Sequence, residues 1–182
     1  MDITQEKSPW PIALKYGLIL SFALILVDLA LYLVNPNADL TKFSLIGLLR
    51  MILGAAIGIY VLYLAAKQRR DVDFDGYMSY GKAFGFMLLV ALPATFIVSL
   101  YSYIFSNYIN PEMMNKIMEA QSEAMYQKGM SEEQIEQSMQ MMQKMNKPFI
   151  AVPIGMIAQL FFSVIYALIA AIFVKKELQN ID

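Results

Sequence analysis

Asp28 and Arg50 are the residues of this chain whose types and positions point most directly to chemistry. Each interrupts a long apolar stretch, Asp28 within residues 12–34 and Arg50 within residues 43–66. Each lies about five residues from the midpoint of its stretch, so in a membrane both are ~7 Å from the bilayer centre on the same side. A lone charge at that depth costs roughly 2.5 kcal/mol or much more, so we expect the two side chains to pair. The pair is either a proton or ion relay, or a structural contact that fixes helix register.

Small residues share the predicted helix face on which Arg50 lies. Gly47, Gly54 and Gly58 recur on this face, and the last two form a Gly-x-x-x-Gly motif. Glycines at this spacing allow the backbone of another helix to approach closely in a membrane. This face is therefore a candidate packing surface for a homo-oligomer or for another membrane protein.

Two groups of residues have a pattern that is found in metal sites. Asp71, Asp73 and Asp75, followed by Gly76, match the opening of a calcium-binding EF-hand loop. Such a loop needs a glutamate at its twelfth position, where this chain has Lys82, and a cation there repels calcium. We therefore interpret the three aspartates as a solvated acidic turn beside two arginines, and as a weak metal candidate only.

The second group consists of Met139, Met142 and Met145. Nine of the fourteen methionines lie between residues 110 and 148. Thioethers are soft ligands that suit Cu(I), so an exposed cluster of them is a weak candidate for copper capture. Methionine is also a good helix former and an adaptable packing residue. Packing is the favoured interpretation, and a partner-binding surface is compatible with it.

The composition excludes most familiar enzyme mechanisms. The chain has 182 residues, of which 58% are hydrophobic and 16% charged, and it contains no cysteine and no histidine. Disulfides, thiol chemistry, a Ser-His-Asp triad and the usual zinc or haem ligands are therefore excluded. The net charge of −1 gives no reason to expect a nucleic-acid partner. We expect a protein that is not an enzyme and that carries no cofactor.

Four apolar stretches must position these residues, at 12–34, 43–66, 83–109 and 149–174. Each is long enough to cross a ~30 Å hydrocarbon core as an α-helix. The sequence predicts a single all-α membrane domain over residues 1–182 with four transmembrane helices. Pro93 is expected to kink the third of them. Tyr101, Tyr103 and Tyr108 are expected to form an interfacial aromatic belt near its outer end.

Residues 111–147 differ in composition and predict an amphipathic helical hairpin outside the membrane. Asn110-Pro111 is a helix-start signal, Gly129 suits a helix end, and Ser131 with Gln134 fits a capping box. Apolar residues form a stripe on each predicted helix, and the two stripes are expected to bury against each other.

Basic residues favour a topology with both termini in the cytoplasm. The N-terminal segment, the second loop and the tail carry eight lysines and arginines, and the first and third loops carry five, including Lys42. The hairpin is then extracytoplasmic.

Several segments resemble one family over nearly the whole chain. They are Gly76 to Phe84 before the third stretch, Tyr103 to Phe105 and Tyr108 to Pro111 at its end, Gly129 to Ile135, and Lys175-Lys176-Glu177. Together they are similar to the bacterial four-span membrane proteins catalogued as domain of unknown function 4199. Lys82 stands where other members carry a glutamine. The resemblance implies this architecture and a bacterial inner-membrane setting, and it brings no activity, cofactor or catalytic residue.

The leading hypothesis for function is a non-enzymatic accessory or scaffolding protein that acts through its hairpin or its glycine-rich helix face. Its partners are then the lipid bilayer and either a second copy or another membrane protein. The alternative is a small transporter or channel that uses Asp28, Arg50 and the kink at Pro93. A weaker alternative is metal sensing through the loop methionines.

Overall fold

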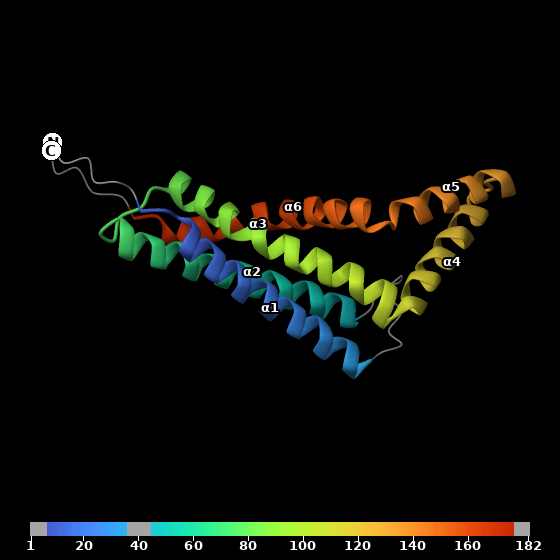
Figure 1. Ribbon diagram of the computed structural model, residues 1–182, viewed down its shortest axis with the longest axis horizontal. Coiled ribbons are helices and arrows are strands. Elements are labelled where there is room, and N and C mark those ends of the chain that lie inside the picture. Colours follow the sequence, from blue (N-terminus) through green and yellow to red (C-terminus); the bar gives the residue numbers. More distant parts are fainter. Residues whose placement is uncertain (1–6, 36–44, 177–182) are drawn as a thin grey trace.

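A computed structural model describes residues 7–35 and 45–176 (Figure 1). The described residues fold into six α-helices and one short π-helix, η1. In chain order they are α1 (Trp10–Val34), α2 (Leu45–Asp73), α3 (Tyr80–Ile104), η1 (Phe105–Ile109), α4 (Pro111–Gln127), α5 (Glu132–Met145) and α6 (Pro148–Val174).

Four of the described segments are long and apolar enough to cross a membrane, as predicted: α1, α2, α3 with η1, and α6. They confirm the all-α fold of a multi-pass membrane protein. α2 continues beyond the predicted end at residue 66 as far as Asp73. The last turn before residue 110 is a π-helix, which was not predicted from the sequence. Lys42 and the predicted start of the second span lie outside the described residues.

Alanines and a few larger side chains, among them Leu62 and Met87, fill the interior of the bundle. α3 packs against α6 and α1, and α2 completes the bundle against the same two helices. Large apolar side chains, such as Phe22, Phe161 and Phe173, are exposed on the outside. This distribution suits a bundle surrounded by lipid, where close backbone approach rather than expulsion of water drives helix packing. The alanines that are fully buried are Ala13, Ala65, Ala66, Ala83, Ala91, Ala167, Ala170 and Ala171.

Pro93 is accommodated within α3 by a glycine on the neighbouring helix. A Cβ atom added at Gly17 of α1 would lie 2.6 Å from the Cγ of Pro93, so only glycine fits against the proline ring. The contact holds α1 and α3 close together at this depth. The kink at Pro93 stays a prediction.

α4 and α5 extend beyond one end of the bundle and meet at a tip (Figure 1, yellow to orange). Gly129 turns the chain there with a φ of 76°, and Ser131 and Gln134 form the predicted capping box. No residue of either helix is buried, which differs from the predicted mutual burial of their apolar stripes. The reason is that α4 continues from the end of α3 and α5 leads into α6, so the two helices spread apart away from their tip.

The opposite end of the bundle is closed by backbone pairing. Met78, in the turn between α2 and α3, and Lys176, just after α6, exchange two backbone hydrogen bonds of 2.9 Å. Arg70 Nη1 also donates to the carbonyl oxygen of Val174 at 2.9 Å and so satisfies a free acceptor at the end of α6. The turn after α2 is therefore fixed to the end of α6.

Candidate functional site

The two predicted intramembrane charges come together in the structure. Arg50 Nη2 of α2 lies 3.1 Å from Asp28 Oδ1 of α1. The hydroxyl of Tyr101 on α3 donates to the other carboxylate oxygen, Oδ2, at 2.8 Å. Asp28 therefore has a partner for each of its oxygens, and the cluster joins three of the four spans.

Tyr101 is the member of this cluster that was not predicted from the sequence. It was predicted to belong to an interfacial belt, but its hydroxyl points inward to Asp28. A signal was present, because Tyr101 lies about five residues outward of the midpoint of its span, at the same depth as Asp28 and Arg50. A carboxylate has two oxygens to satisfy in lipid, so a second donor at that depth was to be expected.

The pair is only partly enclosed by protein. Within the chain, the side chains of Arg50 and Asp28 remain 34% and 23% exposed. Arg50 Nε is buried and has no hydrogen-bond partner among the residues that the structure describes. The arrangement therefore leaves one guanidinium donor without a partner among the described residues.

A small cavity lies near the middle of the spans, inward of this pair. Its volume is about 170 Å3, and it is bounded by all four spans. Thr95, Gln159 and Ser163 supply polar groups to its wall. Gln159 Nε2 donates to Ser99 Oγ at 3.1 Å, across from α6 to α3. The cavity is large enough to hold water, and these three side chains are the polar part of a wall that is otherwise mostly apolar.

The predicted glycine face is used within the chain at one position. A Cβ at Gly58 would lie 2.8 Å from the ring of Tyr166 on α6, so this glycine provides space for that ring. Gly54 has open space around it, with Leu24 at 4.0 Å, and it forms part of the cavity wall. Gly47 is half-buried near the start of α2. Whether this face also contacts a second chain stays a prediction.

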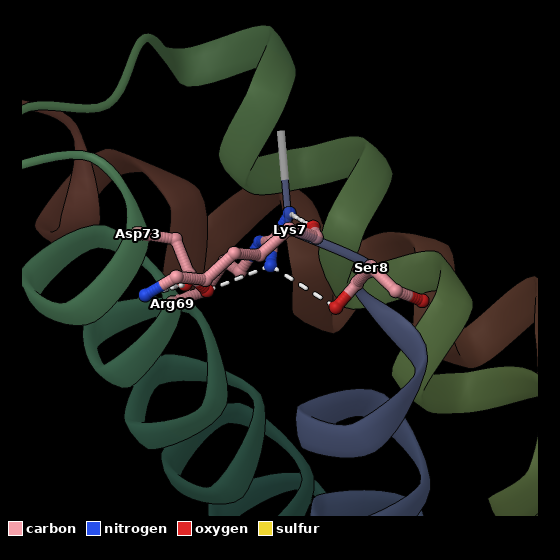
Figure 2. A network of polar contacts seen from close by, with 4 residues as sticks. All are labelled: Lys7, Ser8, Arg69 and Asp73. Carbon is pink, nitrogen blue, oxygen red and sulfur yellow. Dashed lines mark hydrogen bonds and ion pairs between the residues drawn. The ribbon is translucent and has the colours of Figure 1, made fainter. Parts of the chain in front are cut away.

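A second arginine–aspartate pair lies at the end of the bundle where α2 finishes (Figure 2). Arg69 Nη1 lies 2.7 Å from Asp73 Oδ2, and both side chains are only 4% exposed. The same guanidinium donates to the carbonyl oxygens of Lys7 at 2.6 Å and Ser8 at 3.3 Å, which lie just before α1. Its carbon lies 5.3 Å from the ring centre of Phe74. Arg69 therefore fastens the start of α1 to the end of α2.

This network changes the interpretation of the three aspartates after α2. Asp73 is buried against Arg69, so the prediction of a fully solvated turn is wrong for this residue. Asp71 Oδ1 accepts from Arg70 Nε at 2.8 Å, and Asp75 occupies the left-handed region with a φ of 49°. Across residues 7–35 and 45–176, no group of three acidic side chains is placed to hold a metal ion. The missed signal was the spacing of four residues between Arg69 and Asp73 at a helix end.

The candidate copper-binding methionines face the space between α4 and α5. Met142 and Met145 line a groove of about 480 Å3, and Met139 lines a second hollow of about 490 Å3 near the tip. Met114 and Met118 of α4 form the facing wall of the groove, and Ile154 of α6 lies at its base. The three methionines are therefore divided between an apolar groove and a second hollow whose lining includes Glu119 and Glu123.

Residues 15–176 match the model of a family described as protein of unknown function (DUF4199). The chain belongs to this family. The family therefore has at least one member in which four spans surround an intramembrane ion pair. No curated protein and no solved structure matches the chain.

Proposed function

We propose that this protein is a non-enzymatic accessory or scaffolding protein of the membrane. In this proposal the four spans are the anchor, and α4 and α5 form an arm that binds an apolar segment of another membrane protein. The observation that carries the proposal is the groove of about 480 Å3 between the two helices of the arm.

The chemistry of the groove supports a binding role. Its walls carry four methionines, from α4 and α5, and neither helix has a buried residue. Methionine side chains are flexible and polarizable, so they adapt to the shape of an apolar partner. Ala151 and Ile154, in the first turns of α6, add apolar surface at the base of the groove.

The bundle supports an anchoring role. Both oxygens of Asp28 are engaged by side chains from other spans, so the intramembrane charge contributes to holding the helices together. With the topology predicted by the basic residues, the arm reaches into the extracytoplasmic space, where it can meet the outer segments of neighbouring proteins.

Site-specific photo-crosslinking in native membranes tests this proposal. A photoreactive residue in place of Met142, which lines the groove, is expected to give discrete crosslinked products. The matched control replaces Gln140, which is exposed on the same helix and does not line the groove. The proposal requires that Met118→Asp, on the facing wall, removes the products from position 142. Identical products from both positions, or none from Met142, contradict it.

A second candidate function is a small transporter or channel, and the mid-membrane cavity with its polar wall favours it. In this function Asp28 carries a proton or an ion between the cavity and the outer surface. Proton flux into proteoliposomes under an imposed potential tests it. Flux through the parent that Asp28→Asn removes, with the bundle still folded, supports transport; equal flux with both proteins rules it out.

A further inference from the structure

A cavity of about 290 Å3 lies at the end of the bundle opposite the arm. It is bounded by the residues just before α1, the end of α2 and the first turns of α3. Lys7, Arg69 and Lys82 surround its polar side, and Gly85, Phe86 and Leu89 line the side that continues down α3 into the bundle. The cavity is therefore cationic at its outer end and apolar at its inner end.

The positive charges around the cavity exceed the negative ones. Arg69 and Lys7 share a single carboxylate, that of Asp73, with Lys7 Nζ 3.8 Å away. Lys82 Nζ lies 4.8 Å from the ring centre of Phe74, and it forms no ion pair with a carboxylate of the described residues. None of the described residues that line the cavity is acidic. Among the described residues, three cations line the cavity and share one paired carboxylate, a balance that attracts an anion.

The start of α3 adds potential of the same sign. Ser79 caps this helix by accepting from the backbone N–H of Lys82, and Met78 and Gly81 line the cavity beside it. The first backbone N–H groups of a helix carry partial positive charge and favour bound anions.

The inner part of the cavity is open along one face of α3. Gly81 and Gly85 lie four residues apart, and a Cβ atom added at either would meet nothing within 4 Å. The strip between them ends at the apolar side chains of Phe86 and Leu89. A ligand that fits this shape has an anionic head and an apolar extension.

We propose that this cavity binds a phosphate group, held between Lys7 and Lys82 at the membrane surface. The apolar strip below favours the head group of an anionic phospholipid, with an acyl chain beside Gly85. Basic pockets between the ends of transmembrane helices are known to hold such head groups. A soluble phosphorylated compound has the same head-group chemistry and is the other possible source.

The charges argue against a second copy of this chain as the occupant. A two-fold interface places the same patch of each copy against the other. Lys7 and Lys82 of one copy would then face the same lysines of the other copy and repel them. A phosphate group in the same place would attract them.

Native mass spectrometry of the detergent-solubilised full chain, titrated with phosphatidylglycerol, tests the proposal. Lys7→Gln and Lys82→Gln are each expected to weaken lipid binding about fivefold, the factor for one basic side chain near an anionic lipid. Lys67→Gln is the matched control, because Lys67 is exposed at the same end of α2 and does not line the cavity. It should bind the lipid as the parent does. Melting curves without lipid verify that each variant is folded.

Two further experiments identify the source of the phosphate group. Gly85→Leu fills the apolar strip, so it should weaken phosphatidylglycerol binding and leave glycerol 3-phosphate binding unchanged if the ligand is a lipid. If glycerol 3-phosphate at millimolar concentration displaces the lipid fully from the parent, the ligand is a soluble compound. This result still supports a phosphate site.

Three results overturn the proposal. The first is equal lipid binding by Lys7→Gln, Lys82→Gln and Lys67→Gln. The second is binding of phosphatidylcholine to the parent as tightly as phosphatidylglycerol. The third is a dimer of the parent that Gly85→Leu dissociates and that the lysine variants leave intact, which assigns the face to a second copy.

Discussion

The pair Arg50–Asp28 joins α2 to α1, whereas the pair Arg69–Asp73 lies within α2, and the two differ in how completely their polar atoms are satisfied. Arg69 at the end of α2 has a carboxylate, two carbonyl oxygens and an aromatic ring around it, and it is almost fully buried. Arg50 within the membrane has one carboxylate contact, an Nε without a hydrogen-bond partner among the described residues, and a third of its side chain exposed within the chain. The first pair has a fixed geometry, and the second retains freedom to rearrange. Function that needs movement is therefore more compatible with the second.

Removing Arg69 should have the largest effect on stability. Arg69→Ala leaves the buried carboxylate of Asp73 with only the more distant ammonium of Lys7, 3.8 Å away, and it removes the donors to the carbonyl oxygens of Lys7 and Ser8. Breaking a buried pair on one side costs about 3–5 kcal/mol. Thermal unfolding in detergent, followed by circular dichroism, should show the greatest fall in Tm for this variant. A Tm equal to that of the parent would show that the network does not hold α1 to α2.

Asp28→Ala should be destabilising, but less than Arg69→Ala. It leaves Arg50 unpaired and Tyr101 without its acceptor. Loss of one hydrogen-bonded partner of a polar group costs about 1–3 kcal/mol, and a partly exposed arginine can extend toward the interface to reduce that cost. The same thermal unfolding assay measures the loss of stability. If the purified variant melts like the parent, the ion pair does not contribute to the fold.

Tyr101→Phe isolates the contribution of the third helix to the intramembrane cluster. The change removes the hydroxyl that donates to Asp28 and retains the ring, which packs 5.6 Å from Phe105 between centroids. Hydrogen bonds between membrane helices contribute about 0.6 kcal/mol on average, and those to charged groups more, so we expect a loss of about 1 kcal/mol. Tyr103→Phe is the control. A larger loss in the control would contradict the assignment of Tyr101 to the cluster.

Arg50→Lys should have the smallest effect, and it tests the comparison directly. Arg50 uses one terminal nitrogen toward Asp28, and a lysine ammonium can take that place at a cost of about 0.5 kcal/mol or less. Arg69→Lys should cost several times more, because a lysine cannot span the positions that Nη1 and Nη2 occupy. Equal melting temperatures for the two lysine variants would remove the distinction between the pairs.

The spans were predictable because they depend on composition alone. A stretch of about twenty apolar residues has one stable state in lipid, so the four long helices follow directly from the sequence. The meeting of Asp28 and Arg50 follows from the same depth argument. Gly129 and the capping box at Ser131 were predictable as local backbone chemistry.

Features that depend on which helices are neighbours were not predictable. The depth of Tyr101 and the spacing of Arg69 and Asp73 were visible in the sequence. However, the contact of Tyr101 with Asp28, the contact of Gly17 with Pro93 and the bonds of Arg69 to Lys7 and Ser8 require knowing which helices are neighbours. The hydrophobicity of a membrane span does not encode its neighbours, because each span faces lipid on one side and protein on the other. The open groove between α4 and α5 was missed for the same reason, since it depends on where α3 and α6 end.

The two hydrogen bonds between Met78 and Lys176 have a consequence for biogenesis. The turn that carries Met78 leaves the ribosome roughly a hundred residues before its partner, at a synthesis rate of about 5–20 residues per second. During those seconds α3, the arm and α6 are synthesised, and the bonds that close the bundle are unformed. The final contact is therefore made only after the fourth helix has been inserted. Until that moment the unfinished protein is accessible to an assembly factor.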